Sequence, residues 1–143
     1  MQKKDYEIIE HTADIGIRVS APDLAGVFSK AAAAMFDIIA EKKLSAVSRQ
    51  LSAKKVIVKQ KAGNLEELLV NWLNELLSLS AVKELIFYGF KINKLDAKGL
   101  EAEVFAKPMK NFKVNTEIKA ATYHELKVIK VDSGWQAEVI FDV

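Results

Sequence analysis

Two aspartates occupy positions where strand ends could bring carboxylates together. Asp14 precedes a stretch, 15–19, in which apolar and other residues alternate, and Asp142 is the penultimate residue. If the first and last strands are neighbours, both side chains converge with the α-carboxylate of Val143. Such oxygen ligands suit Ca²⁺, Mg²⁺ or Mn²⁺. The alternative is that Asp14 caps a turn and Asp142 is a solvated strand end.

One lysine and two histidines are further candidates. Lys119 lies among acidic and aromatic residues in the segment 115–124, where it could bind phosphate. An exposed edge-strand lysine is the alternative. His11 and His124 could act as metal ligands or acid–base groups. Each could equally be a structural histidine that donates to a backbone carbonyl.

The composition excludes several classes of protein. The 143 residues carry a net charge of +2, too little for a basic coat that wraps nucleic acid. The absence of cysteine excludes disulfide scaffolds, iron–sulfur clusters, cysteine-ligated zinc and thiol catalysis. Phosphate-binding glycine loops, Gly-x-Ser-x-Gly and His-Glu-x-x-His are also absent. A self-sufficient enzyme with a small-molecule substrate is therefore not expected.

Periodicity predicts two helices and a series of strands. The first helix is expected to begin with Ser20 as its cap and to end near Glu41; the second is expected to begin at Asn64, in a capping box with Glu67, and to end near Ser80. Turns are expected at 96–99, with Gly99 at positive φ, and at 132–134. Strands are expected at 6–9, 15–20, 52–60, 85–93, 100–107, 115–124, 126–131 and 135–141.

This order of elements predicts an α+β fold in which a mostly antiparallel sheet packs against two long helices. We expect one domain over 1–143, because no linker or repeat divides the chain. No segment approaches the roughly 18 to 20 apolar residues of a membrane span, and no apolar stretch of a signal peptide follows the N-terminus. A cytoplasmic protein without a membrane partner is the expectation.

Three segments together resemble the archease family. Residues 6–16 read YEIIEHTADIG, which resembles the family's N-terminal signature. The segment 116–124 resembles its second signature, and the ending Phe141-Asp142-Val143 resembles its usual chain end. The similarity extends over essentially the whole chain.

The resemblance implies a protein cofactor rather than an enzyme. Archeases activate the RtcB-type RNA ligase, which uses GTP and Mn²⁺ to seal tRNA halves; they promote ligase guanylylation and multiple turnover in tRNA splicing. The family implies a divalent metal ion on Asp14, Asp142 and Val143, and a functional requirement for Lys119. The tRNA would be contacted only through the ligase.

One segment departs from the family pattern, and two other functions remain open. The stretch 107–113 is basic where many members carry acidic or histidine residues, so a ligand or partner contact supplied there is in question. A chaperone-like modulator of RNA-processing or RNA-modifying enzymes is one alternative function. A small metal-dependent phosphoesterase is the other.

Overall fold

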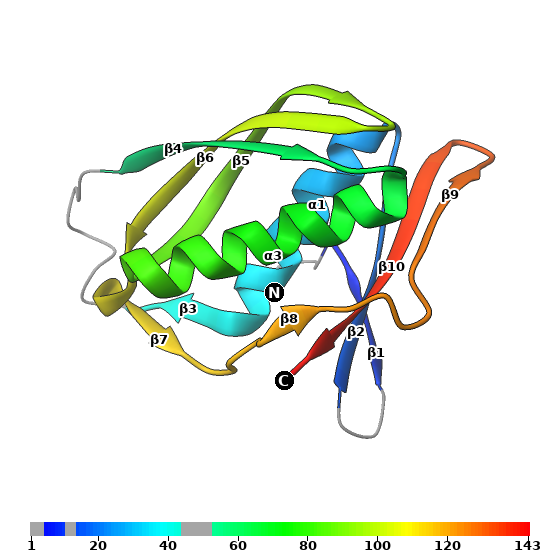
Figure 1. Cartoon of the computed structure of the whole chain (residues 1–143). Helices are drawn as coiled ribbons and strands as arrows, with labels where there is room; N and C mark the ends of the chain where they lie inside the picture. The colour runs from blue at the N-terminus through cyan, green and yellow to red at the C-terminus, as the bar shows by residue number, and fades with distance from the viewer. Residues whose placement is uncertain (1–4, 11–13, 44–52) are drawn as a thin grey trace.

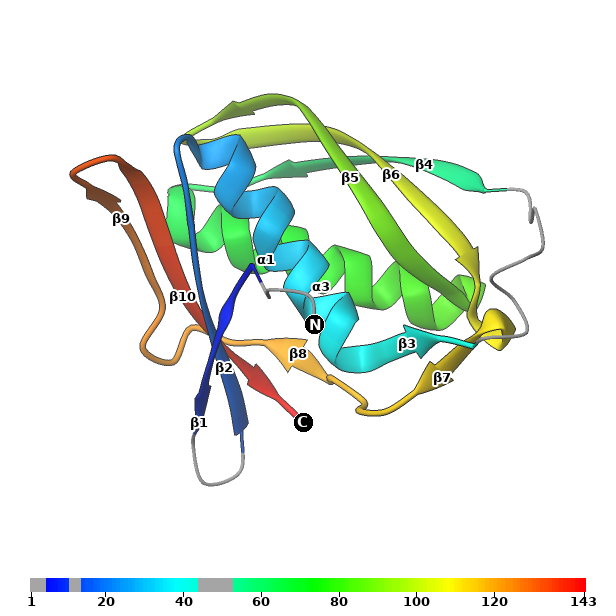
Figure 2. The ribbon, with the colours of Figure 1, turned by 180° about the vertical axis from the view of Figure 1, so that it is seen from behind.

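Two helices form the middle of the molecule, and strands surround them (Figures 1 and 2). The computed structural model describes residues 5–10, 14–43 and 53–143. The helices are α1 (Leu24–Ile39) and α3 (Leu65–Lys83). The strands are β1 (Glu7–Glu10), β2 (Asp14–Ala21), β3 (Ala40–Lys42), β4 (Lys54–Lys61), β5 (Leu85–Asp96), β6 (Gly99–Pro108), β7 (Phe112–Val114), β8 (Ala120–Ala121), β9 (Lys127–Val131) and β10 (Gly134–Asp142), with a 3-10 helix, η1 (Met109–Asn111), after β6.

The strands form three antiparallel sheets. The largest has the order β1-β2-β10-β8, and β9 also pairs with β10. The second has the order β4-β6-β5 and runs along one side of the helix pair, while β3 and β7 form a third, two-stranded sheet. The α+β prediction is confirmed, with the strands divided among three sheets. Among the described residues, no helix is long and apolar enough to cross a membrane.

The first helix is capped by Asp23 rather than by Ser20. The Asp23 carboxylate accepts a hydrogen bond of 2.7 Å from the Gly26 N–H. Ser20 stays extended because β2 pairs with β10 through Ala21, so the predicted cap was wrong. The helix ends before Glu41 because β3 begins directly after it and pairs with β7.

The second helix begins as predicted. The Asn64 side chain accepts a hydrogen bond of 2.8 Å from the Glu67 N–H, and the Glu67 carboxylate accepts one of 3.0 Å from the Gly63 N–H. This reciprocal pair satisfies donors that a helix start leaves free. The helix continues past Ser80 to Lys83, and Glu84 ends it in the left-handed conformation, with φ 54°.

The core lies between the helices and the sheets. Helix α1 packs against β2 and β5, and α3 packs against β4, β5 and β8. Trp72 is fully buried and its indole N–H donates to the Phe28 carbonyl at 3.0 Å, while Trp135 is only half-buried. Each large apolar side chain buried in this way contributes roughly 1.5–3 kcal/mol. The fully buried large side chains include Trp72, Phe28, Phe87, Phe141, Ile17 and Met35.

The two predicted hairpin turns are present, but the positive φ is in the second. In the first, Asp96 pairs with Gly99 and its carboxylate accepts a hydrogen bond from the Lys98 N–H at 2.8 Å. Gly99 is already an ordinary strand residue, so the prediction of positive φ there was wrong. Gly134 has φ 157°, and a Cβ there would lie 2.2 Å from the Ala21 oxygen. Gly134 thus lets the β9–β10 hairpin approach the start of α1.

Candidate functional site

Asp14 and Asp142 are cross-strand partners. Strands β2 and β10 pair antiparallel in a register that sets Asp142 opposite Asp14. Figures 1 and 2 show the end of β10 beside the start of β2. Directly opposite residues point to the same face, with Cβ atoms roughly 4.5–5.5 Å apart. The sequence prediction required the first and last strands to be neighbours. In the structure the second strand, β2, which carries Asp14, lies beside the last strand, β10, while β1 pairs, among the described strands, only with β2.

The two carboxylates have no compensating charge within the described part of the chain. Asp14 is half-buried and Asp142 is exposed. Among the described residues, neither side chain has a hydrogen bond or an ion pair. Like charges directly opposite each other in a sheet are destabilising. A cation that prefers oxygen ligands would relieve this repulsion, so the pair fits the predicted metal ion chemically.

On the same face of the sheet, another row of side chains has its acidic charges neutralised by a cation. Two rows from the aspartates, Arg18 lies opposite both Glu7 and Glu138. The Arg18 guanidinium lies 2.6 Å from the Glu7 carboxylate and 3.3 Å from that of Glu138. Hydrogen bonds to Glu7 and then Glu138 raise the pKa of Arg18. Arg18 forms ion pairs within its own row and does not neutralise Asp14 or Asp142.

An apolar row separates the two charged rows. Gly16 lies opposite Ile9 on one side and Ile140 on the other. A Cβ on Gly16 would lie 3.1 Å from the Ile9 oxygen and 3.2 Å from its Cβ. Glycine therefore lets β1 approach β2 closely at this row, which is next to the row of the aspartates.

Lys119 reaches the aspartate pair through its backbone. Its N–H donates a hydrogen bond of 2.8 Å to the Asp142 carbonyl, and Ala120 lies opposite Asp142. The side chain of Lys119 is exposed and has no ion pair within the described residues. The arrangement puts Lys119 one residue from the acidic row.

The segment around Lys119 is not the long strand that was predicted over 115–124. Only Ala120–Ala121 forms a strand, β8. Ile118 and Ala121 are both buried, three positions apart, which breaks strand alternation. The backbone of this segment is irregular because it forms hydrogen bonds with side chains as well as with the neighbouring strand. Thr122 donates from both its N–H and its hydroxyl to the Ile140 carbonyl, at 3.0 and 2.9 Å.

A residue that the sequence analysis did not single out holds the other edge of β8. Asn74, on α3, donates from its amide to the Ala121 carbonyl at 3.1 Å and accepts from the Ala121 N–H at 2.7 Å. Asparagine is an unfavourable residue inside a helix, because its side chain competes for backbone hydrogen bonds. Its position beside an apolar helix stripe was the available signal.

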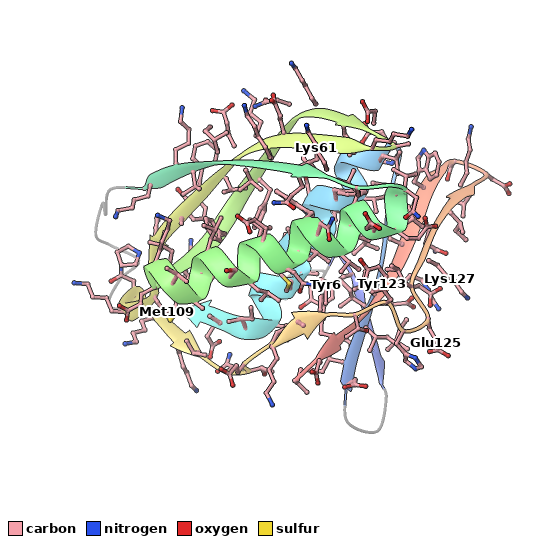
Figure 3. The ribbon with its side chains drawn as sticks, in the orientation of Figure 1. Tyr6, Lys61, Met109, Tyr123, Glu125 and Lys127 are labelled. Atoms are coloured by element: carbon pink, nitrogen blue, oxygen red, sulfur yellow. The ribbon has the colours of Figure 1, made fainter. Side chains whose placement is uncertain are left out.

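The histidines are not brought to the aspartates by any described contact. His124 is exposed on the turn after β8, and its N–H lies 3.3 Å from the Thr122 hydroxyl. Figure 3 labels Tyr123 and Glu125 on the same turn. His11 lies outside the described residues. A role for either histidine therefore stays a prediction.

Two side chains, those of Asp14 and Asp142, could serve as ligands of a metal ion. Within residues 5–10, 14–43 and 53–143, no three His, Cys, Asp or Glu side chains group closely enough to hold a metal ion. Val143 directly follows Asp142, and its half-buried side chain packs against the core. A main-chain oxygen of Val143 could join the two aspartates, with the remaining positions open to water or a partner.

The basic segment 107–113 lies away from the aspartates. It comprises the end of β6, η1 and the start of β7. Figure 3 shows Met109 at the opposite end of the molecule from Tyr123 and Glu125. Figures 1 and 2 show η1 apart from the end of β10 and the start of β2, so the middle of this segment changes a surface other than the acidic row.

Two lysines of β4 have acidic partners on β6. Lys55 lies 3.3 Å from the Glu103 carboxylate, and Lys59 lies 3.4 Å from that of Glu101. Asn93 and then Lys55 lower the pKa of Glu103 by hydrogen bonding to its carboxylate. These pairs belong to a solvated sheet face.

Comparison with known proteins assigns the family. The model of the archease protein family matches residues 6–143. A Methanosarcina barkeri archease is 36% identical over 149 residues, covering 99% of this chain and 98% of that protein. A Pyrococcus abyssi archease is 36% identical over 149 residues, covering 98% and 99%. The chain belongs to the archease family.

Solved structures agree with the archease fold. Protein 1598 of Methanobacterium thermoautotrophicum has a TM-score of 0.72 at 26% identity and covers 99% of this chain and 100% of its own. A Thermotoga maritima protein, described as an archease and possible chaperone, has a TM-score of 0.65 at 23% identity and covers 100% and 98%. The second likeness supports the archease fold alone.

Proposed function

We propose that this archease is a protein cofactor of an RtcB-type GTP-dependent RNA ligase. In this role it promotes guanylylation of the ligase and multiple turnover during tRNA splicing in the cytoplasm. The observation that carries the proposal is the pair Asp14 and Asp142, set opposite each other without a cationic partner in the described structure. Family membership supports the choice of partner.

A divalent cation is the proposed ligand of this pair. The side chains of Asp14 and Asp142 and a main-chain oxygen of Val143 would hold it. A bound divalent cation supplies charge that stabilises developing negative charge on phosphate oxygens. Oxygen ligands discriminate weakly between Ca²⁺, Mg²⁺ and Mn²⁺, so the proposal covers all three.

The residues around the pair have separate tasks in this proposal. Lys119 extends an ammonium group from the segment that borders Asp142, where it attracts a phosphate or an acidic residue of the ligase. His11 and His124 are proposed to contact the partner. The acidic row lies at a strand end, so the small domain can present it to a recessed active site. The ligase contributes the nucleotide and contacts the RNA.

A general chaperone-like modulator is the second candidate; the Thermotoga maritima protein, which shares the fold, is described as a possible chaperone. Such a protein would stabilise RNA-processing enzymes through surface contacts and would not need the aspartate pair. The two candidates therefore differ in their dependence on Asp14 and Asp142.

Multiple-turnover RNA ligation separates the candidates. An RtcB-type ligase with GTP and Mn²⁺ would be assayed with this protein, with Asp142→Ala, and with Asp132→Ala as the matched control, since Asp132 lies exposed at the other end of β10. Stimulation lost only in Asp142→Ala supports the activator with a metal site. Stimulation by all three proteins would contradict the proposed metal site. If none of them stimulates a ligase that is itself active, the chaperone-like role is favoured.

A further inference from the structure

The side chain of Asn74 takes the place of a neighbouring strand. Its amide forms two hydrogen bonds with a single peptide position, 3.1 Å to the Ala121 carbonyl and 2.7 Å from the Ala121 N–H. Donor and acceptor are thus used in the pattern by which one strand pairs with another. Both bonds are partly buried, which protects them from competition with water.

Strand β8 is held from both sides. On one edge, Ala121 lies opposite Phe141 and Ala120 lies opposite Asp142. On the other edge, Asn74 binds Ala121. A strand of two residues is too short to hold its place by ladder bonds alone. The α3 side chain therefore contributes to the position of this backbone.

We infer that Asn74 is a positioning residue for the site formed by Asp14, Asp142 and Lys119. Asn74 fixes Ala121, the preceding Ala120 borders Asp142, and the Lys119 N–H bonds the Asp142 carbonyl. Helix α3 thereby sets where the ammonium and the carboxylates lie relative to each other. The inference rests on the proposed function and adds a residue to it.

A purely structural asparagine would satisfy the same backbone groups without affecting the site. The chain offers a matched control for this alternative. Asn71, on the same helix, donates one hydrogen bond of 3.1 Å to the Lys61 carbonyl, away from β8. Asn71→Ala therefore removes a helix-to-strand bond without touching the acidic row.

The test measures Mn²⁺ binding by calorimetry, with no nucleotide or ligase present. The proteins are the unsubstituted chain, Asn74→Ala, Asn74→Ser and Asn71→Ala, each checked by circular dichroism. Residues behind the ligands typically change metal affinity 10–100-fold, so the Kd is expected to rise about tenfold in Asn74→Ala. Asn74→Ser provides a small neutral variant if Asn74→Ala does not fold. Asn71→Ala is expected to keep the unsubstituted Kd.

The variant Asp14→Asn distinguishes a failure of the inference about Asn74 from a failure of the proposed metal site. If Asp14→Asn abolishes binding while folded Asn74→Ala and Asn74→Ser bind as tightly as the unsubstituted protein, the role of Asn74 is wrong and the proposed metal site stands. If the unsubstituted protein binds no Mn²⁺, the metal site fails, and ligase stimulation decides the role of Asn74 toward Lys119. In that assay, adding Asn74→Ala to Lys119→Ala must cause no further loss of ligase stimulation. If the losses of the two single variants add up in the double variant, the inference is overturned.

Discussion

Asp14 lies directly opposite Asp142 on neighbouring antiparallel strands, although the two residues lie near opposite ends of the sequence. Two rows away on the same face, Arg18 bridges Glu7 and Glu138. The sheet thus contains one compensated and one uncompensated acidic row within the described residues. This contrast, rather than the mere presence of acidic residues, makes Asp14 and Asp142 the candidate site.

The first prediction concerns the repulsion between the two aspartates. Without metal, Asp14→Asn is expected to raise the free energy of unfolding by about 0.2–1 kcal/mol, because it removes one of two opposed charges. Added Mn²⁺ is expected to stabilise the unsubstituted protein by about 2.7 kcal/mol at roughly 100 times the Kd, and to leave Asp14→Asn unchanged. Urea unfolding with Mn²⁺ and with EDTA measures both. Equal Mn²⁺ stabilisation of the two proteins contradicts the site.

The second prediction tests the close approach at Gly16. Gly16→Ala is expected to destabilise the fold by about 1–3 kcal/mol, because the new Cβ meets the Ile9 backbone at 3.1 Å. Gly63→Ala is the matched control, since nothing lies within 4 Å of a Cβ there. Urea denaturation at neutral pH compares the two variants. A Gly16→Ala protein as stable as Gly63→Ala would show that Ile9 does not crowd this row.

The third prediction concerns alkaline pH. The Tyr6 hydroxyl donates a 2.5 Å hydrogen bond to Asp37. Burial, then the hydrogen bond and charge of Asp37, raises the pKa of Tyr6 above its ordinary value near 10. The folded state keeps this proton where the unfolded state loses it, so stability present below about pH 10 falls as the pH rises further.

Tyr6→Phe is expected to remove this part of the alkaline loss. Unfolding free energies at about pH 9 and about pH 11 give the difference for each protein. Tyr123→Phe is the control, because Tyr123 is 59% exposed. The same alkaline loss in Tyr6→Phe and the unsubstituted protein would assign the effect to other groups.

The fourth prediction concerns the charge of Lys119. Lys119→Ala is expected to reduce ligase stimulation at low salt, with a smaller difference at high salt, because exposed charges are screened over roughly 10 Å at 0.1 M ionic strength. The fold should be unaffected, since the described hydrogen bond of Lys119 comes from its backbone. Lys130→Ala, at an exposed position on β9, is the control. Unchanged stimulation by Lys119→Ala at low salt would exclude an electrostatic role.

Local patterns predicted the two helices and the longer strands, but they did not predict β3 or β7, and β8 is much shorter than the strand expected over 115–124. The capping box of Asn64 and Glu67 placed the start of α3, and the alternation over 15–19 placed β2. The cap of α1 was misassigned because Ser20 is a good cap by type, while long-range pairing with β10 keeps it in a strand. Propensity cannot register such a tertiary constraint.

The sequence suggested the residues of the candidate site, but it did not show which contacts hold them in place. The pairing of Asp14 with Asp142 depends on strand register between distant segments, so the sequence allowed it only as a condition. Strand β8 is shorter than predicted, and its free edge bonds to the side chain of Asn74 on α3. The alternation pattern of a strand carries no information about such a partner. Position in the chain singled out the two aspartates, resemblance to the archease family implied a metal ion on them, and the structure shows that they lie opposite each other.

Guanylylation of the ligase tests the central claim most directly. A purified RtcB-type ligase would be given GTP and Mn²⁺ with the unsubstituted protein, with the double variant Asp14→Asn/Asp142→Asn, or with Asp132→Asn. The account predicts that the unsubstituted protein and Asp132→Asn accelerate formation of the guanylylated ligase, and that the folded double variant loses this acceleration by about tenfold or more. Equal acceleration by all three proteins would contradict it.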